Sequence, residues 1–387
     1  MTGARLGLGL LLVALGPLGA AAAEPGVTES GIVVGCAAPL SGPLGPSAQQ
    51  TTQFGVDLYF KVVNDAGGIH GRRVRTIYYD DKGRVKETLA ATQRLVAEDR
   101  VFAVLAPQGV APVAAVLDYL EAQKVPLIFP LQGSPVVRGR KHVVAGTMLY
   151  DRQSRATIDY LTGPRKARRI AVLYQNDEYG KSFLGFVRKD LTRRGLKPVA
   201  VVPVERGQVE MGTPMATARA ARPDVLLLVL TPGPAANALK ERQKLGWAEV
   251  IVVATGPLAD ERYLAIAGDA AEGVEALALW PDPLTSDLPG VRQYRDHLRR
   301  HFPKNEPNRA SLAGYFAAML LTEGARRAGR DLTRETLLAA LEGLRGWDNG
   351  ILSPITIGRD HEVQKRALWA RLERGRFKPV TDWLPSD

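Results

Sequence analysis

The chain has 387 residues, of which 45% are hydrophobic and 24% are charged. This composition is typical of a globular protein with about two or three domains. The formal net charge is +11, or +10 without Arg5 of the N-terminal segment, but the basic residues are scattered and no nucleic-acid motif accompanies them. The charge therefore favours a solvated basic surface and argues against a nucleic-acid partner.

The first 23 residues have the features of an export signal. Arg5 supplies a positive charge, residues 6–18 are apolar apart from glycine and proline, and alanines 21–23 form a small-residue cleavage site. The apolar run is shorter than the roughly 20 residues that span a bilayer. We therefore expect cleavage after Ala23 and a periplasmic protein. Cys36, the only cysteine, falls in a predicted strand, which favours a buried thiol over a lipidation site and allows no intrachain disulfide.

Residues 32–79 predict a strand, a helix and a second strand. Residues 32–38 are an apolar run that ends in a Pro/Ser/Gly turn, and residues 54–63 place apolar side chains on one face of a helix. That helix ends at residues 64–68, because glycine adopts the left-handed conformation of a helix C-cap at little cost. The second strand is predicted at residues 74–79.

The same alternation continues along the chain. Further strands are predicted at residues 101–106, 125–129, 169–174, 197–202, 225–230, 250–254 and 367–372, and helices at 112–123 and 309–328. Apolar strands that alternate with helices indicate an α/β protein whose parallel sheets are covered by helices on both faces.

Several segments resemble the periplasmic binding proteins of the leucine/isoleucine/valine type. They are PLSGP after the first strand, NDAGGIHGR after the first helix, a strand ending in YDD, YQNDEYGKSF at 174–183, RPDVLLLVL at 222–230 and YLAIAGDAAEGV at 263–274. The resemblance spans nearly the whole mature chain. It implies the two-lobed type I fold, in which each lobe is a mostly parallel sheet flanked by helices and the ligand cleft lies between the lobes.

The resemblance also implies how the lobes are connected and what the protein does. Three crossovers are expected near residues 146–150, 279–283 and 352–357. After a signal peptide at 1–23, the predicted first lobe comprises 24–147 plus 282–352, and the second comprises 148–281 plus 353–387. The implied function is that of a monomeric receptor that captures a small solute and delivers it to an ABC permease in the inner membrane.

Ligand sites of parallel sheets lie at the carboxyl ends of strands. This rule selects the loops at 39–47, 107–112 and 130–135 and the turns that begin at Gln175, Thr231 and Thr255. In amino-acid binders of the family, a hydroxyl side chain and backbone N–H groups of the second and third loops hold the ligand carboxylate, and a tyrosine, an aromatic and an acidic residue of the second lobe complete the pocket. The candidate ligand-binding residues are Ser47, Gln108, Gly109, Val110, Leu131, Gln132, Gly133, Ser134, Tyr150, Tyr179, Thr231 and Gly256.

The sequence keeps only part of the amino-acid site that the resemblance implies. Tyr179 is retained, but the loop at 107–112 has no serine or threonine, TPGP at 231–234 has no aromatic residue, and ATGPL at 254–258 has no acid. A buried ammonium group without a partner costs several kcal/mol. We therefore expect a ligand less polar than a standard α-amino acid, such as an aromatic or aliphatic carboxylate or a lipid-like or sterol-like molecule.

Several candidates have a structural explanation beside the functional one. Tyr179 is also suited to packing at a helix start, and Tyr150 to packing in a crossover. Ser134 and Gln132 are also suited to hydrogen bonds within their turn, and Ser47 to capping the first helix. Gly109 and Val110 are expected to contribute backbone N–H groups at a helix N-terminus, a role that does not depend on the side chain.

No pattern in the sequence indicates an enzyme, a metal site or a cofactor. His297 and His301 are spaced i, i+4, but Leu298-Arg299-Arg300 between them contains no glutamate, which favours a solvated basic helix face over a zinc site. The nucleophile elbow G-x-S-x-G, the dinucleotide-binding pattern G-x-G-x-x-G in the loop at 39–47 and a Walker loop are all missing. A binding protein remains, either an importer receptor or a periplasmic carrier or sensor for an apolar ligand.

Overall fold

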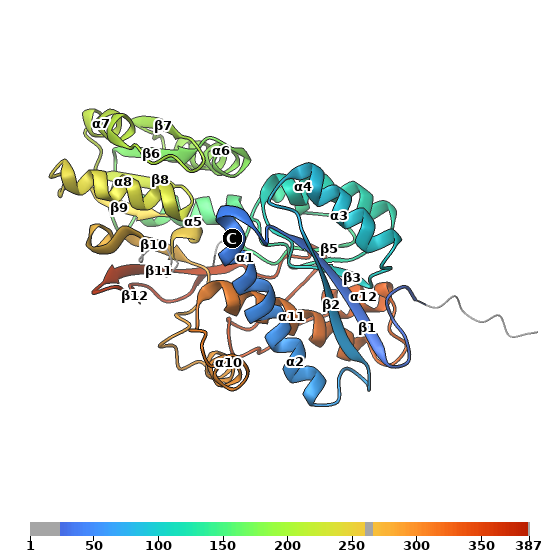
Figure 1. Ribbon diagram of the computed structural model, residues 1–387. Helices are drawn as coiled ribbons and strands as arrows, with labels where there is room; N and C mark the ends of the chain where they lie inside the picture. The colour runs from blue at the N-terminus through green and yellow to red at the C-terminus, as the bar shows by residue number, and fades with distance from the viewer. Residues whose placement is uncertain (1–23, 260–265, 386–387) are drawn as a thin grey trace, which may run out of the picture.

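The computed structural model describes residues 24–259 and 266–385, which form two separate sheets covered by helices (Figure 1). The predicted signal peptide at 1–23 lies outside the described residues. Within the described ranges, no helix combines the length and the apolar character needed to cross a bilayer.

The first sheet has five strands in the order β2-β1-β3-β4-β5, and all neighbouring pairs are parallel. Its strands are β1 (Gly31–Ala38), β2 (Arg73–Asp80), β3 (Ala103–Leu105), β4 (Leu127–Ile128) and β5 (Val143–Val144). Four of them fall at predicted positions, but β3 and β4 are shorter than the apolar runs at 101–106 and 125–129. They end early because Ala106 and Phe129 adopt positive φ angles, which interrupt an extended strand.

Helices cover both faces of the first sheet. They are α1 (Gly45–Thr51), α2 (Asp57–Asp65), α3 (Val85–Ala97), α4 (Val110–Ala122), α10 (Pro289–His301), α11 (Arg309–Ala328) and α12 (Arg334–Glu342), with short turns η1 (Gly42–Leu44) and η3 (Pro135–Val137) and a π-helical stretch η2 (Thr52–Val56). Leu117 of α4 belongs to the core on one face, whereas Leu58 of α2 and Phe316 of α11 belong to the core on the other. The predicted helix at 309–328 coincides with α11. Cys36 is buried as predicted, at 1% exposure, and burial raises the pKa of its thiol.

The second sheet combines a parallel part with an antiparallel end. Strands β7-β6-β8-β9-β10 are parallel neighbours, and β11 then pairs antiparallel with β10, β12 and β13. The strands are β6 (Ile170–Gln175), β7 (Ala200–Val204), β8 (Val225–Val229), β9 (Ile251–Ala254), β10 (Glu275–Ala278), β11 (Arg366–Glu373), β12 (Arg376–Pro379) and β13 (Leu384–Pro385). The sequence predicted five of these strands and missed β10, β12 and β13.

Two apolar layers enclose the second sheet. Helices α5 (Tyr150–Thr162) and α6 (Glu178–Thr192) pack on one face through residues such as Ile158 and Phe183. Helices α7 (Gly212–Ala220) and α8 (Pro232–Lys244) pack on the other face through residues such as Met215 and Leu239. The short turns η4 (Gly256–Leu258) and η5 (Gly268–Ala271) complete this part of the fold.

A buried glutamine joins the three chain segments that connect the sheets. The Gln364 side chain accepts a hydrogen bond from the Met148 N–H (3.4 Å) and donates one to the Leu279 carbonyl (3.1 Å). It is 4% exposed. These positions lie in or near the predicted crossovers, although Ile357 and Val363 still pack in the core of the first sheet. The predicted lobe boundaries stay a prediction, and we propose that the third connection follows Val363.

Candidate ligand-binding site

The loops at the carboxyl end of the first sheet start from strained backbone. Ala106 directly follows β3 with φ 53°, and Phe129 directly follows β4 with φ 56°. A left-handed conformation costs a residue with a side chain about 1–2 kcal/mol. The Phe129 ring is held by Trp280 and Phe316, with ring centroids 6.2 and 5.5 Å away. Aromatic packing thus fixes the point at which the chain turns into the loop at 130–135.

The loop at 107–112 brings a helix N-terminus to this edge. Gly109, with φ 94°, precedes α4, and its N–H donates to the Leu131 carbonyl (3.4 Å). Gln108 and Leu131 form an isolated parallel bridge that extends the pairing of β3 and β4. Val110 begins α4 and packs against the α5 and α6 core of the second sheet. Because N–H groups in the first turn of a helix have no helical acceptor, this end of α4 favours an anion.

The polar side chains of the loop at 130–135 are used by the loop itself. Gln132 accepts a hydrogen bond from the Ser134 N–H (2.5 Å) and donates one to the Ser134 carbonyl (3.3 Å). The Ser134 hydroxyl accepts from the Val136 N–H (3.5 Å). The Gly133 carbonyl accepts from the Tyr150 N–H (2.6 Å), and a Cβ on Gly133 would overlap the Tyr150 ring. The structural explanation therefore accounts for Gln132 and Ser134.

Two tyrosines from the second sheet's helices face each other beside these loops. The rings of Tyr150, which begins α5, and Tyr179, in the first turn of α6, lie 5.5 Å apart. The Tyr179 hydroxyl hydrogen-bonds the Thr255 hydroxyl (2.7 Å) at the end of β9. Burial raises the pKa of both phenols above the usual range, so both stay neutral at physiological pH.

A chain of polar contacts continues along the carboxyl end of the second sheet. Asp177 caps α6 by accepting from the Gly180 N–H (3.1 Å), and it also accepts from the Gln175 amide (2.5 Å). The side-chain oxygen of Gln175, Oε1, in turn accepts a hydrogen bond from the Thr231 hydroxyl (2.6 Å). The Thr231 side chain is thus directed to Gln175, and the one carboxylate here already has two donors.

Gly256 lies beside a buried amide of α5. A Cβ on Gly256 would lie 3.3 Å from the Gln153 Oε1 and 3.2 Å from the Leu279 side chain. Gln153 is 1% exposed, and its Nε2 donates to the Met148 carbonyl (2.6 Å). Gly256 therefore packs closely against the Gln153 oxygen and Leu279, and a side chain at this position would crowd both.

The expectation that Ser47 caps the first helix is wrong. Helix α1 begins at Gly45, with Leu44 at the N-cap, so Ser47 lies inside the first turn. Its carbonyl accepts a hydrogen bond from the Thr51 hydroxyl (3.3 Å). Among the candidate residues, contacts connect the loops at 107–112 and 130–135 with Tyr150 and Tyr179, and Ser47 has no part in those contacts.

Four residues of this region were not among the candidate ligand-binding residues: Gln153, Gln175, Asp177 and Thr255. Asp177 precedes a helix, where an aspartate is a common N-cap, and Thr255 directly follows a predicted strand. Both signals were therefore present in the sequence. Gln175 marked the start of a selected turn, but its bond to Thr231 spans 56 positions. The position of Gln153 depends on how α5 packs, which no local pattern specifies.

Metal-binding side chains do not cluster in the described structure. Within residues 24–259 and 266–385, no group of three or more histidine, cysteine, aspartate or glutamate residues is placed to hold a metal. His297 is not on a solvated face, because its Nδ1 lies 2.8 Å from the Tyr315 hydroxyl and burial lowers its pKa. Its imidazole therefore supports helix packing between α10 and α11.

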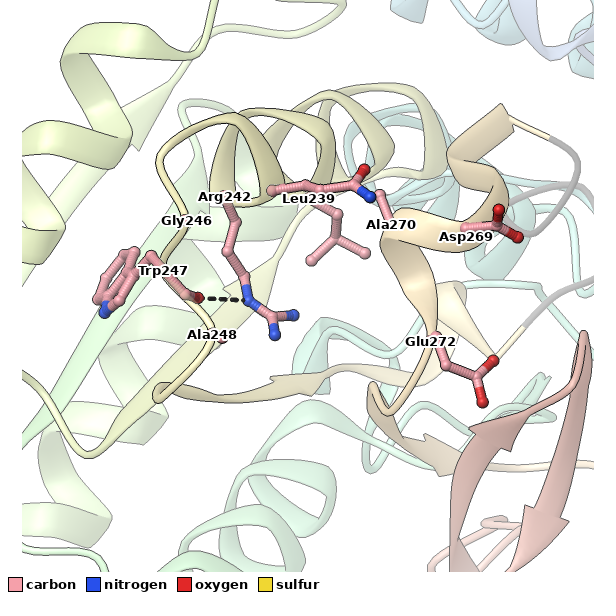
Figure 2. Close-up of a pocket in the computed structure, with 9 residues that line it drawn as sticks. Leu239, Arg242, Gly246, Trp247, Ala248, Asp269, Ala270 and Glu272 are labelled. Atoms are coloured by element: carbon pink, nitrogen blue, oxygen red, sulfur yellow. Dashed lines mark hydrogen bonds between the residues drawn. The ribbon is translucent and has the colours of Figure 1, made fainter.

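A cavity of about 220 Å³ lies at the C-terminal end of α8 (Figure 2). Leu239, Trp247, Asp269 and Glu272 line it, and Arg242 donates a hydrogen bond from Nε to the Trp247 carbonyl (2.9 Å) across one side. The cavity contains none of the candidate residues. Its location at the end of a helix, rather than at the carboxyl ends of the strands, separates it from the site described above.

Comparisons with known proteins agree with this fold. The family described as "Periplasmic binding protein" matches residues 31–376. The Leu/Ile/Val-binding protein homolog 3 of Brucella melitensis is 25% identical over 302 residues, which cover 77% of this chain and 79% of that protein.

Two solved structures share the fold over most of both chains. A branched-chain amino acid ABC transporter protein from Thermus thermophilus with bound valine has a TM-score of 0.82 and 20% identity, covering 92% of this chain and 97% of that chain. A fatty acid ABC transporter substrate-binding protein from Thermomonospora curvata has a TM-score of 0.85 and 22% identity, covering 94% and 95%. The chain therefore belongs to the periplasmic binding protein family and is of its leucine/isoleucine/valine-binding type.

Proposed function

We propose that this substrate-binding protein of the branched-chain amino acid ABC transporter type captures a ligand that is less polar than a standard α-amino acid. The ligand would lie against Tyr150, Tyr179 and Val110, between the carboxyl ends of the two sheets. It would then be delivered to an ABC permease in the inner membrane. Family membership supports the transport role, and the composition of the loops supports the choice of ligand.

The observation that carries the ligand proposal is that none of the candidate residues is acidic. The loop at 254–258 has no acid, and the nearby Asp177 carboxylate is directed at donors of its own segment, the Gly180 N–H and the Gln175 amide. An ammonium ion buried without an anion is strongly disfavoured. An aromatic or aliphatic carboxylate needs only N–H donors and apolar walls, and burial of apolar surface contributes about 25 cal/mol per Å².

A periplasmic carrier or sensor for an aromatic, lipid-like or sterol-like ligand is the alternative role. The same apolar loops support it, and the fold is shared with a protein described as a fatty acid ABC transporter substrate-binding protein. Uptake of labelled ligand distinguishes the roles. Loss of uptake in cells that lack the protein supports import, whereas unchanged uptake with an altered transcriptional or lipid-trafficking response supports the carrier or sensor.

Ligand capture is proposed to close the two lobes around the site. The lobes are joined at segments that meet around Gln364, which suits a hinge. Closure requires that the ligand bind the closed form more tightly than the open form. Small-angle scattering with and without saturating ligand measures the change in radius of gyration, and identical profiles would count against a hinge. We further propose a monomeric periplasmic protein without cofactor or catalytic activity, released by cleavage after Ala23.

Calorimetry against matched ligands tests the proposed function. The set contains leucine, isoleucine and valine, an aromatic acid series, a fatty acid and a sterol. We expect micromolar or tighter binding within the apolar set and weaker binding of the amino acids. Micromolar binding of leucine with none of the apolar set would contradict the proposal and would identify Asp177 as the first residue to test as an ammonium partner.

A further inference from the structure

Basic residues that are scattered in the sequence meet at one edge of the second sheet. The amino ends of β7, β6, β8 and β9 lie side by side there, because these strands are parallel neighbours. Eight lysines and arginines but only two acids, Asp224 and Glu249, occupy the loops that lead into these strands, which are residues 163–169, 193–199, 221–224 and 245–250. The edge therefore carries a strong positive charge.

Nearby carboxylates neutralise only some of this charge. Three of the eight cations have acidic partners: Arg165 pairs with Glu275, Arg193 with Asp190 and Arg194 with Asp159. The other five, together with one arginine in the last turn of α7, form no ion pair with a carboxylate in the part of the chain that the structure describes, and all are exposed. We call this group the basic edge: Lys166, Arg168, Arg169, Lys197, Arg219 and Arg222.

Hydrogen bonds between neighbouring loops hold part of the basic edge together. Arg169 donates from Nε to the Arg222 carbonyl (2.8 Å) and from Nη2 to the Ala221 carbonyl (2.7 Å). Arg219 donates from Nη1 to the Leu245 carbonyl (2.9 Å). These contacts connect the loops before β6, β8 and β9, so the cations of three loops form one continuous surface.

Stabilisation of helix ends explains only part of the basic edge. A cation in the last turn of a helix offsets the negative end of the helix dipole, and this effect fades beyond that turn. Arg219 is in the last turn of α7, and Arg169 donates to carbonyls just after it. Lys166, Arg168 and Lys197 instead lie four or more residues beyond the preceding helix, and their side chains make no hydrogen bond within the described residues. Their charges are directed to solvent.

The composition of these loops favours a lipid surface over a protein as the partner. Protein interfaces place apolar and aromatic side chains at their centre. None of the exposed large apolar side chains of residues 24–259 and 266–385 lies in the four loops. Lysine and arginine bind the phosphates of anionic phospholipids through their charge alone, and arginine adds paired hydrogen bonds. The chain also belongs to a family of transport receptors, whose permease partner lies in a membrane.

We propose that the basic edge binds the surface of a membrane that contains anionic phospholipids. The cations contact headgroup phosphates, and the loops stay outside the acyl chains because they carry no apolar residue to insert. The candidate ligand-binding site is at the carboxyl ends of the same sheet, at the edge that faces the first sheet, so this contact leaves it free (Figure 1). The contact concentrates the protein at the membrane, and it goes beyond the proposed function because it involves a different surface and no solute.

Vesicle sedimentation tests the proposal with the full-length mature protein. One set of vesicles is phosphatidylcholine alone, and the other contains about 30% phosphatidylglycerol. We expect the anionic vesicles to bind at least about tenfold more protein than the neutral ones at about 50 mM salt. Binding should weaken about tenfold or more at about 300 mM salt, because salt screens exposed charges.

A triple charge reversal assigns the binding to the basic edge. Lys166→Glu/Arg168→Glu/Lys197→Glu changes three exposed side chains that make no hydrogen bond in the described structure. It should lower the affinity for anionic vesicles about tenfold or more. The midpoint of urea denaturation should match that of the wild type, which shows that the loss does not come from unfolding.

A second triple variant separates the position of the charges from their number. Lys86→Glu/Arg292→Glu/Lys304→Glu changes the net charge equally, at exposed positions around the first sheet. We expect it to bind anionic vesicles within about twofold of the wild type. Equal losses in the two triple variants would show that net charge alone attracts the protein, and the proposal would be wrong.

Two further results would overturn the proposal. One is that the wild type fails to bind anionic vesicles at low salt, even if it binds polyglutamate as a model of an acidic protein. The other is equal binding to neutral and anionic vesicles, which would indicate apolar insertion. Neither result affects the proposed function, because the calorimetric test of solute binding uses no lipid surface.

Discussion

The first sheet ends in two residues with left-handed backbone, Ala106 and Phe129, whereas the strands of the second sheet end in side chains that hydrogen-bond one another. In the loops that follow the first sheet, polar side chains hydrogen-bond within their own loop, as Gln132 does with Ser134. At the second, Thr231 and Thr255 join a network with residues of β6 and α6. The first lobe therefore contributes backbone shape and a helix N-terminus, and the second contributes oriented side chains.

This difference indicates how strongly substitutions in each lobe will change the free energy of unfolding. In the first lobe, the backbone and its close packing tolerate few added atoms, so a larger residue there should lower the free energy of unfolding. A substitution in the side-chain network of the second lobe removes about one hydrogen bond, so its effect should be smaller and should depend on pH. The predictions below test that division, beginning with the ion network that joins the two regions.

The largest effect is expected at Glu362, which is 2% exposed and lies between two arginines. Its oxygens accept from the Nε of Arg138 and of Arg152, each at 2.7 Å. Glu362→Gln removes a buried charge and leaves the guanidinium groups less well compensated. We expect the free energy of unfolding to fall by about 3 kcal/mol, measured by urea denaturation.

An exposed pair provides the control for Glu362. Glu98 pairs with the Arg94 Nε at 3.1 Å, and its side chain is 67% exposed. Glu98→Gln should change the free energy of unfolding by less than about 0.5 kcal/mol, because water screens such pairs. Equal effects of the two substitutions would mean that the network between the lobes adds nothing to stability.

The contact between Gly133 and Tyr150 should give the next largest effect. A Cβ on Gly133 overlaps the Tyr150 ring, which is itself buried, so Gly133→Ala forces a shift where the two regions meet. Overpacking of this kind costs about 2 kcal/mol of unfolding free energy. Gly185→Ala on α6 is the control, since no atom of the described residues lies within 4 Å of its added Cβ. Alanine is the better helix former, so that control should gain up to about 1 kcal/mol.

Local sequence patterns predicted most of the fold. Apolar runs placed β1, β2, β6, β8 and β9 to within about two residues, and a long apolar stretch placed α11. Such patterns work because central parallel strands such as β8 are buried on both faces. They located β3 and β4 but overestimated their lengths, because the apolar run continues past each strand into Ala106 or Phe129, and a positive φ in these residues leaves no mark on hydrophobicity.

The candidate site was less accessible to sequence reasoning because its contacts are distant in the chain. Tyr179 was identified from its motif, but its partner Thr255 lies 76 positions away. The family resemblance implies an acid in the loop of Gly256, but the polar atom next to Gly256 is the Gln153 Oε1 of helix α5. A local motif identifies which loops face a site, whereas the direction of each side chain depends on the packing of the lobes.

Tyr179→Phe tests the side-chain network of the second lobe. The substitution removes the hydrogen bond to Thr255 (2.7 Å) and keeps the ring beside Tyr150. We expect the free energy of unfolding to fall by about 1 kcal/mol at pH 7. Thr255→Val removes the other partner, and a double-mutant cycle between the two substitutions reports the coupling energy.

The stability difference between the wild type and Tyr179→Phe should disappear at alkaline pH. Burial raises the folded-state pKa of Tyr179, so above the ordinary value of about 10 the unfolded phenol ionises while the folded phenol stays neutral. The wild type therefore loses stability as the pH rises through that region, by about 1 kcal/mol per unit for this group, and Tyr179→Phe lacks that loss. The two proteins should become equally stable near pH 11. A constant difference from pH 7 to 11 would show that the Tyr179 phenol ionises equally in both states.

The smallest effect is expected at Ala106, and its comparison with Ala254 distinguishes the ends of the two sheets most directly. Ala106 after β3 and Ala254 at the end of β9 are both fully buried, but only Ala106 has a positive φ angle. Replacing either by glycine removes a buried methyl group, at about 0.8 kcal/mol, and adds flexibility to the unfolded chain, at about 0.5–1 kcal/mol.

At Ala106 this loss is offset, because glycine adopts the left-handed conformation without the cost of about 1–2 kcal/mol. We therefore expect Ala254→Gly to lower the free energy of unfolding by about 1.5 kcal/mol and Ala106→Gly to leave it within about 0.5 kcal/mol of the wild type. Parallel urea denaturation of the two variants measures the difference. If both lose the same stability, then the backbone after β3 stores no strain, and the two sheets end in the same way.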